Sequence, residues 1–423
     1  MDIALKYGCN PHQTPASVRV PDEAGFKVLS GRPGYINFLD ALGAWQLVRE
    51  LKAATGKPGA ASFKHVSPAG AAVAAPLSDV YRASQFLPDG DYSPVATAYA
   101  RARGGDRMCS FGDVAAVSDV VDLSLARLLF EEVSDLIIAP GYEPEALELL
   151  KSKRNGAYIV LRIDPDYEPA DTETREVFGF TMTQKRNTAR ITKDLFTKGV
   201  AAGRPGAAAG AGGADAAAGG VRPTGAAADA DRPGAAGDAA IPDDVLETLV
   251  VTTIALKYTQ SNSVGLGYDG QVIGMGAGQQ SRVHCTRLAC DKADKWLLQQ
   301  HPKTMALKIK ADLPKPEKAN MVDYFLLWDQ LSDVEKAKLR AGLDADPDPI
   351  TREERAEWVK RFDGICLSSD AFIPFPDNLD RAAKTNVQYV AQAGGSVRDD
   401  IVTQAAEEYG MTMIHTGLRL FLH

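Results

Sequence analysis

The chain has 423 residues, more than one compact core usually holds, so two or three domains or a duplicated unit are expected. Hydrophobic residues make up 45% of the chain and charged residues 24%, the balance of an ordinary globular protein. The net charge of −8 argues against general nucleic-acid binding. The sequence contains no stretch of about 18 apolar residues, so no membrane span is expected.

The N-terminal residues and the cysteines indicate the compartment. The sequence MDIALKYGCN lacks the basic and apolar regions of a signal peptide. The cysteine spacing matches neither a zinc site nor a disulfide framework. Free thiols in a reducing cytoplasm are therefore expected at Cys9, Cys109, Cys285, Cys290 and Cys366.

The first half of the chain alternates strand and helix patterns. AASFKHV (60–66) predicts a strand, and SPAG (67–70) after it carries turn residues. Further along, the expected order is helix, strand, helix, strand, over SLARLLFEE (124–132), VSDLIIAPG (133–141), YEPEALELLKS (142–152) and AYIVLRI (157–163).

A segment of unusual composition divides the chain near its middle. Between positions 201 and 240, 31 of 40 residues are Ala, Gly or Pro, and Val221 is the only large aliphatic residue. Such a composition cannot bury enough apolar surface to offset its ordering entropy. The composition predicts a disordered insert, and an Ala-rich helix is the alternative, which the recurring Gly and Pro disfavour.

The second half repeats the order of the first. A helix is expected over 243–258, a hairpin over 261–278 around Asp269-Gly270, and a helix over 282–301 that Pro302 ends. The order helix, strand, helix, strand then follows at 378–386, 387–395, 396–410 and 411–416. Strands alternating with helices in both halves favour an α/β fold built from a duplicated unit.

Lys64 and His65 are the most suggestive polar pair. They stand where an apolar strand meets a predicted turn, and α/β enzymes place reactive side chains at such junctions. Neighbouring strand residues point to opposite faces, so the two converge on one ligand only if the strand bends or ends there. On spacing alone, a surface lysine beside a core histidine is the favoured reading.

Three other segments carry polar or aromatic side chains. YTQSNSV (258–264) groups hydroxyl and amide residues. The glycine-rich segment GMGAGQQSRVH (274–284) stands at the start of a predicted helix, so it either binds an anion or simply forms a tight turn. SSDAFIPFPDNLDRA (368–382) either walls a flat heterocycle with aromatic residues or packs them inward, with Asp377 or Asn378 capping the next helix. The tail HTGLRLFLH, taken alone, is expected to fray.

Together these segments resemble the AICAR transformylase domain, which in many organisms forms the C-terminal part of a bifunctional purine-biosynthesis protein. The matching stretches run in family order across nearly the whole chain. They are KYGCNPHQ, SGRPGYINFLDALGAWQLVREL, SFKHVSPAGAAV, AYARARGGDRMCSFGD, EVSDLIIAPGYEPEAL, QKRN, KYTQSNSV, GQVIGMGAGQQSRVHCTRLA, SSDAFIPFPDN and HTGLRLFLH.

The resemblance implies a fold and partners. Two cytidine deaminase-like α/β subdomains without zinc are expected over 1–200 and 241–423, separated by the insert 201–240. The substrates implied are AICAR (5-aminoimidazole-4-carboxamide ribonucleotide) and 10-formyltetrahydrofolate, with active sites at a homodimer interface. The resemblance also implies a bound structural potassium ion. Neither nucleic acid nor a membrane is an expected partner.

The implied reaction is formyl transfer to the 5-amino group of AICAR. The resemblance assigns catalysis to Lys64, His65 and Asn262. A histidine titrates near neutrality and suits proton acceptance from the amine, lysine can stabilise the oxyanion or protonate the leaving group, and asparagine can orient either. Substrate binding is assigned to Lys6, Tyr7, Arg282, Phe372, Asn378, Arg419 and His423. Folate binding is assigned to Gly112, Asp135, Asn320, Pro374 and Asp377.

Three departures from the family pattern affect these expectations. Lys6 replaces an arginine, which weakens paired phosphate contacts, and Gly394-Gly395 replaces a serine-glycine pair that contacts folate. The sequence has no segment matching the family's cyclohydrolase domain, so a monofunctional transformylase is expected. The alternatives are a hydrolase of the formylated product and an inactive homologue that binds purine nucleotides.

Overall fold

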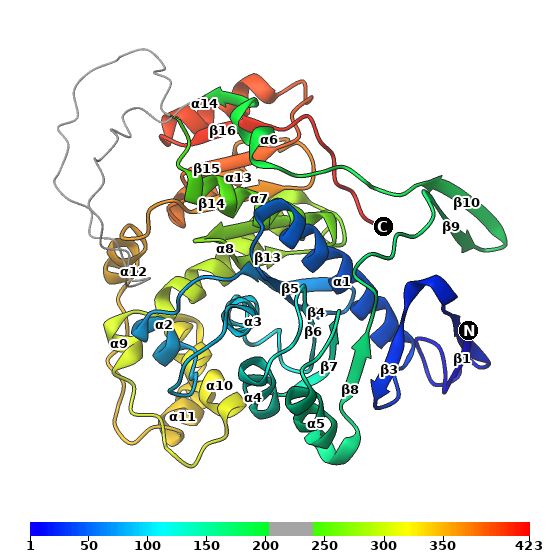
Figure 1. Cartoon of the computed structure of the whole chain (residues 1–423). Helices are drawn as coiled ribbons and strands as arrows, with labels where there is room; N and C mark the ends of the chain where they lie inside the picture. Colours follow the sequence, from blue (N-terminus) through cyan, green and yellow to red (C-terminus); the bar gives the residue numbers. More distant parts are fainter. Residues whose placement is uncertain (203–239) are drawn as a thin grey trace.

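A single mixed β-sheet organises the chain in the computed structural model, which describes residues 1–202 and 240–423 (Figure 1). Within the described residues the sheet has 12 strands in the order β11-β16-β15-β14-β12-β13-β5-β4-β6-β7-β8-β3. Almost all of the predicted Ala/Gly-rich insert, at 203–239, lies outside the described residues. The mixture of helices with a large sheet confirms the α/β class.

The first half of the chain forms one side of the sheet. Its strands are β3 (Lys27–Ser30), β4 (Gly59–Lys64), β5 (Ser67–Val73), β6 (Asp113–Val117), β7 (Ser134–Ala139) and β8 (Ile159–Arg162). Its helices are α1 (Tyr35–Thr55), α2 (Asp79–Ser84), α3 (Pro94–Gly104), α4 (Leu123–Glu131) and α5 (Pro144–Ser152), with short 3-10 turns at Asp22–Ala24 and Lys153–Gly156. The expected helix and strand order from 124 to 163 is confirmed.

The second half forms the other side. Its strands are β11 (Val200–Ala202), β12 (Val264–Tyr268), β13 (Gln271–Gly276), β14 (Cys366–Ser369), β15 (Tyr389–Gln392) and β16 (Thr412–His415). Its main helices are α7 (Asp243–Lys257), α8 (Arg282–Gln299), α13 (Asp377–Lys384) and α14 (Asp399–Glu408). An additional group follows α8: α9 (Pro302–Met305), α10 (Lys315–Leu326), the 3-10 turn Trp328–Gln330, α11 (Asp333–Ala341) and α12 (Arg352–Val359).

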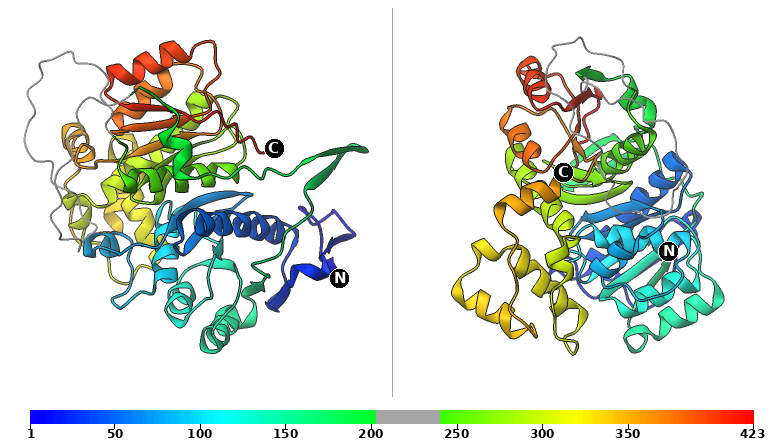
Figure 2. Two further views of the ribbon diagram at one scale, coloured as in Figure 1. Left: turned by 45° about the horizontal axis from the view of Figure 1, so that its top comes forward. Right: turned by 90° about the vertical axis from the view of Figure 1, so that its left-hand side faces the viewer.

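Both halves present the same order of elements and the same strand pairing. In each, a helix (α1, α7) precedes an antiparallel hairpin (β4–β5, β12–β13), and the first hairpin strand pairs antiparallel with the next strand (β6, β14). Two parallel pairings follow, and an antiparallel edge strand closes each side. The halves meet where β5 pairs with β13 through Ala72 and Gln271. Figure 2 shows the two halves stacked on one another across this seam.

Apolar side chains cover both faces of the sheet. The helices α1 and α7 lie on one face and share a core that runs across both halves, including Trp45 and Leu249. The opposite face carries separate cores, one under α3 to α5 and one under α8, α13, α14 and the additional helices. Burial of both faces accounts for the nearly continuous apolar sequence of strands such as β7.

Two small elements stand apart from this body. The strands β1 (Asp2–Leu5) and β2 (Ala16–Arg19) form a hairpin near the N-terminus. The strands β9 (Thr172–Val177) and β10 (Phe180–Lys185) form a second one, which projects from the body in Figure 1 and precedes α6 (Lys193–Thr197). Every residue of β9 and β10 is exposed. In the described part of the chain, no helix combines the length and apolar character of a membrane span.

The predicted turn at SPAG is wrong. Residues 67–70 are the start of β5, and the chain turns earlier, at His65 and Val66. The small residues are there for packing, because a side chain at Gly70 would place its Cβ 2.1 Å from the carbonyl oxygen of Ala102 in α3. By contrast, the predicted hairpin turn at Asp269-Gly270 is confirmed, with both residues in the left-handed region.

Candidate active site

A strained turn presents Lys64 and His65. The strand β4 ends at Lys64, which pairs with Ser67 of β5, so His65 and Val66 form the two-residue tip. Both tip residues have positive φ, 53° and 59°, a conformation that a β-branched residue such as Val66 rarely adopts. His65 is exposed. The strand β4 thus ends at Lys64, which meets the condition under which Lys64 and His65 can converge on one ligand.

Asp40 holds this turn from below. Its carboxylate lies on the buried side of α1 and accepts a hydrogen bond from the backbone N–H of Val66 at 2.6 Å. Burial raises the pKa of Asp40, while the backbone N–H groups of Val66 and His65 and the charge of His65 oppose the rise. This residue was not among the candidates from the sequence. An aspartate within the apolar face of a long helix was the available signal.

Lys64 lies beside two other predicted residues. Its ammonium group donates to the carbonyl oxygen of Phe111. Gly112, which follows, has a φ of 74°, and a Cβ there would lie 4.0 Å from Lys64 Nζ and 3.7 Å from Asp135 Oδ2. Asp135 also pairs with Arg154 at 2.6 Å. The structure therefore brings Lys64, Gly112 and Asp135 together at one end of the first half.

Asn262 and Arg282 form a second group, in the other half. Asn262 Oδ1 accepts from Arg282 Nη2 at 3.0 Å, and its Nδ2 donates to the carbonyl oxygen of Gln279 at 3.1 Å. The guanidinium of Arg282 is buried and also donates to Ser369 Oγ at 2.9 Å and to the carboxylate of Asp370. Arg282 consequently orients Asn262 within this chain, and much of its donor capacity is already used.

The C-terminal tail lies against this second group. Ser261 exchanges two hydrogen bonds with Leu422: its N–H donates to the Leu422 carbonyl at 3.0 Å, and its hydroxyl accepts from the Leu422 N–H at 3.1 Å. The backbone of Leu420 is bonded to that of Asp370. The expectation of a frayed tail is therefore wrong, because the polar 258–264 segment pairs with it. Arg419 and His423 both have exposed side chains in this single chain.

The aromatic loop before α13 is partly exposed. Phe372 and Phe375 are 43% and 47% exposed, so they are not packed inward, and the guanidinium of Arg398 stacks on Phe375 at 4.7 Å. The alternative of a helix cap is wrong: α13 begins at Asp377 after Pro376, and no side chain caps it. Asn378 is buried and accepts from the Thr286 hydroxyl at 2.7 Å. Pro374 and Asp377 stay at or near the surface.

One hydrogen bond connects the Lys64 group and the Asn262 group among the described residues. The backbone N–H of Gln260 donates to Ser67 Oγ at 3.3 Å, which places the 260–263 segment beside the turn that carries His65. Lys6 and Tyr7 contact each other at 5.8 Å but make no recorded hydrogen bond or ion pair with Arg282 or His65 within residues 1–202 and 240–423. Among the described residues, the structure thus brings the segments that carry His65 and Asn262 into contact at Ser67 and Gln260, and it leaves Lys6 and Tyr7 apart from them.

A pocket of about 250 Å³ lies next to the Lys64 group, and we call it the Arg107 pocket. Phe111, whose carbonyl binds Lys64, lines it from one side. The predicted folate residue Asn320 lines it from α10 on the other side. Arg107 itself lines the pocket and was not among the candidates from the sequence.

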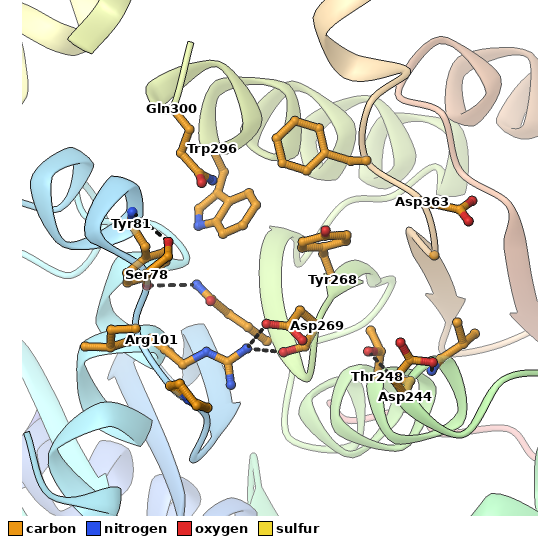
Figure 3. A pocket seen from close by; sticks show the side chains of 16 residues that line it. Ser78, Tyr81, Arg101, Asp244, Thr248, Tyr268, Asp269, Trp296, Gln300 and Asp363 are labelled. Atoms are coloured by element: carbon orange, nitrogen blue, oxygen red, sulfur yellow. Dashed lines mark hydrogen bonds and ion pairs between the residues drawn. The ribbon is translucent and has the colours of Figure 1, made fainter. Parts of the chain in front are cut away.

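A second pocket, of about 140 Å³, lies at the far end of β5 and is shown in Figure 3. We call it the Trp296 pocket. Tyr81, Tyr268 and Trp296 line it beside the ion pair between Arg101 and Asp269. The indole N–H of Trp296 is buried and has no partner among the described residues. None of the residues predicted for the site lines this pocket.

Comparisons with known proteins identify relatives. A family model described as "AICARFT/IMPCHase bienzyme" matches residues 2–209 and 227–292, more than half of the chain. The chain is 28% identical over 427 aligned residues to the bifunctional purine biosynthesis protein PurH of Sorangium cellulosum. It is 27% identical to the proteins of that name from Roseobacter denitrificans and Magnetococcus marinus. Each alignment covers 99% of this chain but only 58–59% of the relative's own length.

Proposed function

Because this chain belongs to the AICARFT/IMPCHase bienzyme family, we propose that it is an enzyme of purine biosynthesis that transfers a formyl group from 10-formyltetrahydrofolate to the 5-amino group of AICAR. The sequence stretches that carry the resemblance are those expected of a transformylase. The proposal is accordingly limited to formyl transfer, without cyclohydrolase activity.

The observation that carries the proposal is the position of the His65 turn against the 260–263 segment. The amine of AICAR is a poor nucleophile because its lone pair is delocalised into the ring and the carboxamide. It must lose a proton as it attacks the formyl carbon. The exposed imidazole of His65 is the proton acceptor in this proposal, and the substrate carboxamide relays the proton.

Lys64 and Asn262 complete the proposed chemistry. Attack on the formyl carbon creates a tetrahedral oxyanion, and the folate nitrogen must then leave. Lys64 supplies the positive charge that stabilises the oxyanion or the proton for the leaving nitrogen. Asn262, ordered by Arg282, supplies an oriented amide.

The binding residues extend this proposal. Arg419 and Lys6 are exposed cations proposed for the phosphate, Tyr7 and His423 are proposed to bind the same nucleotide, and Arg282 contributes what donor capacity remains. Phe372 offers an exposed ring for the imidazole, and Asn378 is buried behind it. Gly112, Asp135, Asn320, Pro374 and Asp377 are proposed for the folate. A structural potassium ion stays a prediction, since the resemblance assigns it to no residue of this sequence.

A second copy of the chain is proposed to complete the site. An apolar row on α1, formed by Tyr35, Ile36, Leu39 and Leu42, is 38–40% exposed. The β9–β10 hairpin exposes Phe178 and Phe180, and an isolated two-stranded hairpin is marginally stable without support. Burial of these surfaces in a homodimer would allow Lys6 and Tyr7 to reach the partner's site. The repeated order of elements supports two cytidine deaminase-like units over 1–200 and 241–423, on either side of the 201–240 insert.

A steady-state assay with AICAR and 10-formyltetrahydrofolate tests the proposal. Release of tetrahydrofolate together with accumulation of the formylated nucleotide is expected, and chromatography for IMP tests whether the chain also closes the ring. Binding of AICAR without turnover would favour an inactive nucleotide-binding homologue. Hydrolysis of the formylated nucleotide in the absence of folate would favour a hydrolase.

A further inference from the structure

The Trp296 pocket lies across the seam between the two halves, at the opposite end of β5 from the His65 turn. Ser78, Tyr81 and Arg101 line it from the first half, and Tyr268 faces them from the second half (Figure 3). Its volume of about 140 Å³ has room for roughly ten water-sized groups. No residue proposed above for AICAR, folate or catalysis belongs to its lining, so a ligand here would be separate from those substrates.

Three aromatic rings of the second half form one corner of this pocket. The ring centroid of Tyr268 lies 5.9 Å from that of Trp296 and 5.5 Å from that of Phe362. The centroids of Trp296 and Phe362 are 6.5 Å apart. The planes of the three pairs are inclined by 56°, 77° and 65°, so the rings form a corner and do not stack. Aromatic faces attract cations within about 6 Å of the ring centroid, and such a corner therefore favours a cation over an anion.

The charged side chains of the pocket add to this preference. Asp244, Asp269 and Asp363 contribute three carboxylates, and Arg101 is the only cation among the described residues of the lining. Arg101 is buried and already donates to the carboxylate of Asp269 at 3.0 Å and to the carbonyl of Val73 at 2.7 Å. Three carboxylates and one guanidinium leave the lining with a formal charge of −2. The pocket is therefore electrostatically suited to a positively charged ligand.

A buried amide in the lining is available for hydrogen bonding. Gln300, which follows α8, is 7% exposed, and its side chain makes no hydrogen bond with any residue that the structure describes. A buried carbonyl oxygen without a donor costs free energy, so a ligand N–H that reaches Gln300 would bind favourably. The indole N–H of Trp296 is also unpaired, but it is shielded from solvent, and we assign it no ligand. The ligand that fits is thus a cation with N–H donors.

We propose that the Trp296 pocket binds a small organic cation that carries N–H donors, an alkylguanidinium or alkylammonium ion. Its charge lies against the aromatic corner of Tyr268, Trp296 and Phe362 and near the carboxylates of the lining, and one of its N–H groups is donated to Gln300. This site goes beyond the proposed formyl transfer and does not depend on it. Because residues of both halves line the pocket, a bound cation should also stabilise the seam by mass action.

The test uses a pair of ligands of the same shape and different charge. n-Butylguanidinium carries the cation and its N–H groups, and n-butylurea keeps the N–H groups and the butyl chain without the charge. In calorimetric titrations of wild type we expect n-butylguanidinium to bind at least about 10-fold more tightly than n-butylurea. The same cation should raise the thermal unfolding midpoint in a concentration-dependent way. Absence of binding, or equal binding of the two ligands, refutes the proposal.

Variants then locate the bound cation. Tyr268→Leu, Gln300→Leu and the double variant Asp244→Asn/Asp363→Asn should each weaken n-butylguanidinium binding by about 5- to 30-fold, the scale of a lost cation–π contact, hydrogen bond or charge pair. The control Asp312→Asn, at an exposed position outside the lining, should bind as wild type does. The double variant removes only exposed charges, so it decides the question even if Tyr268→Leu or Gln300→Leu does not fold. Wild-type affinity in the double variant, or an equal loss in Asp312→Asn, would place the cation elsewhere and overturn the proposal.

Discussion

The buried carboxylate under the His65 turn gives the sharpest prediction. In Asp40→Asn, the oxygen can still face Val66, but the hydrogen bond loses its charge. A hydrogen bond to a charged group contributes about 1.5–3 kcal/mol, and each left-handed residue outside glycine costs about 1–3 kcal/mol. The hydrogen bond at 2.6 Å thus offsets much of the strain at His65 and Val66, and the neutral variant should let the turn relax.

The expected effect is on turnover rather than on substrate affinity. With about 1.4 kcal/mol for each tenfold change, kcat should fall roughly 10- to 100-fold because the imidazole is no longer held in place. The KM for AICAR should change little, since Asp40 is buried away from solvent. Steady-state kinetics of Asp40→Asn measure both values, with the exposed Asp312→Asn as the matched control.

Stability separates positioning from folding. Burial already raises the pKa of Asp40, which means that the fold pays to bury its charge, and the neutral amide removes that cost. We therefore expect the free energy of unfolding of Asp40→Asn to stay within about 1 kcal/mol of wild type. A variant with wild-type kcat would refute the positioning role, and a variant that unfolds at much lower denaturant would show that Asp40 is structural.

Three other changes have defined outcomes. His65→Ala should lower turnover about 10²- to 10⁴-fold while AICAR affinity, measured by calorimetry, is retained; equal turnover would remove His65 from the mechanism. Gly70→Ala should lower the free energy of unfolding in urea by about 1–3 kcal/mol, because its Cβ would meet the Ala102 carbonyl at 2.1 Å, whereas Gly141→Ala, with ordinary contacts, should not. Burial lowers the pKa of Lys153 to about 8, so the unfolded chain binds more protons above that pH and wild type should gain stability there. Relative to Lys153→Met, the gain should be about 1–3 kcal/mol between pH 8 and 10; a pH-independent difference would contradict this assignment.

Local patterns predicted the elements well, and their failures have physical causes. The Asp269-Gly270 hairpin and the helix and strand order of both halves follow from turn chemistry and apolar spacing, which are local properties. SPAG was misread because small residues serve a close helix contact as readily as a turn, and only the position of α3 decides between them.

The site was harder to predict than the fold. The sequence pointed to Lys64 and His65, but their relation to the 260–263 segment depends on a pairing across nearly 200 residues. Asp40 was missed for the same reason. It acts through Val66, a partner distant in sequence, and that contact is not visible in residue spacing.

The seam between the halves has a consequence for how the chain can be divided. β5 and β13 are buried almost throughout and pair at Ala72 and Gln271. Arg101 donates to the Val73 carbonyl of its own half and to the carboxylate of Asp269 in the other half. Either half produced alone would present its seam strand as a bare, apolar sheet edge. Such edges recruit strands from other molecules. Each half on its own is thus expected to aggregate, and co-expression of the two should restore solubility by covering both edges at once.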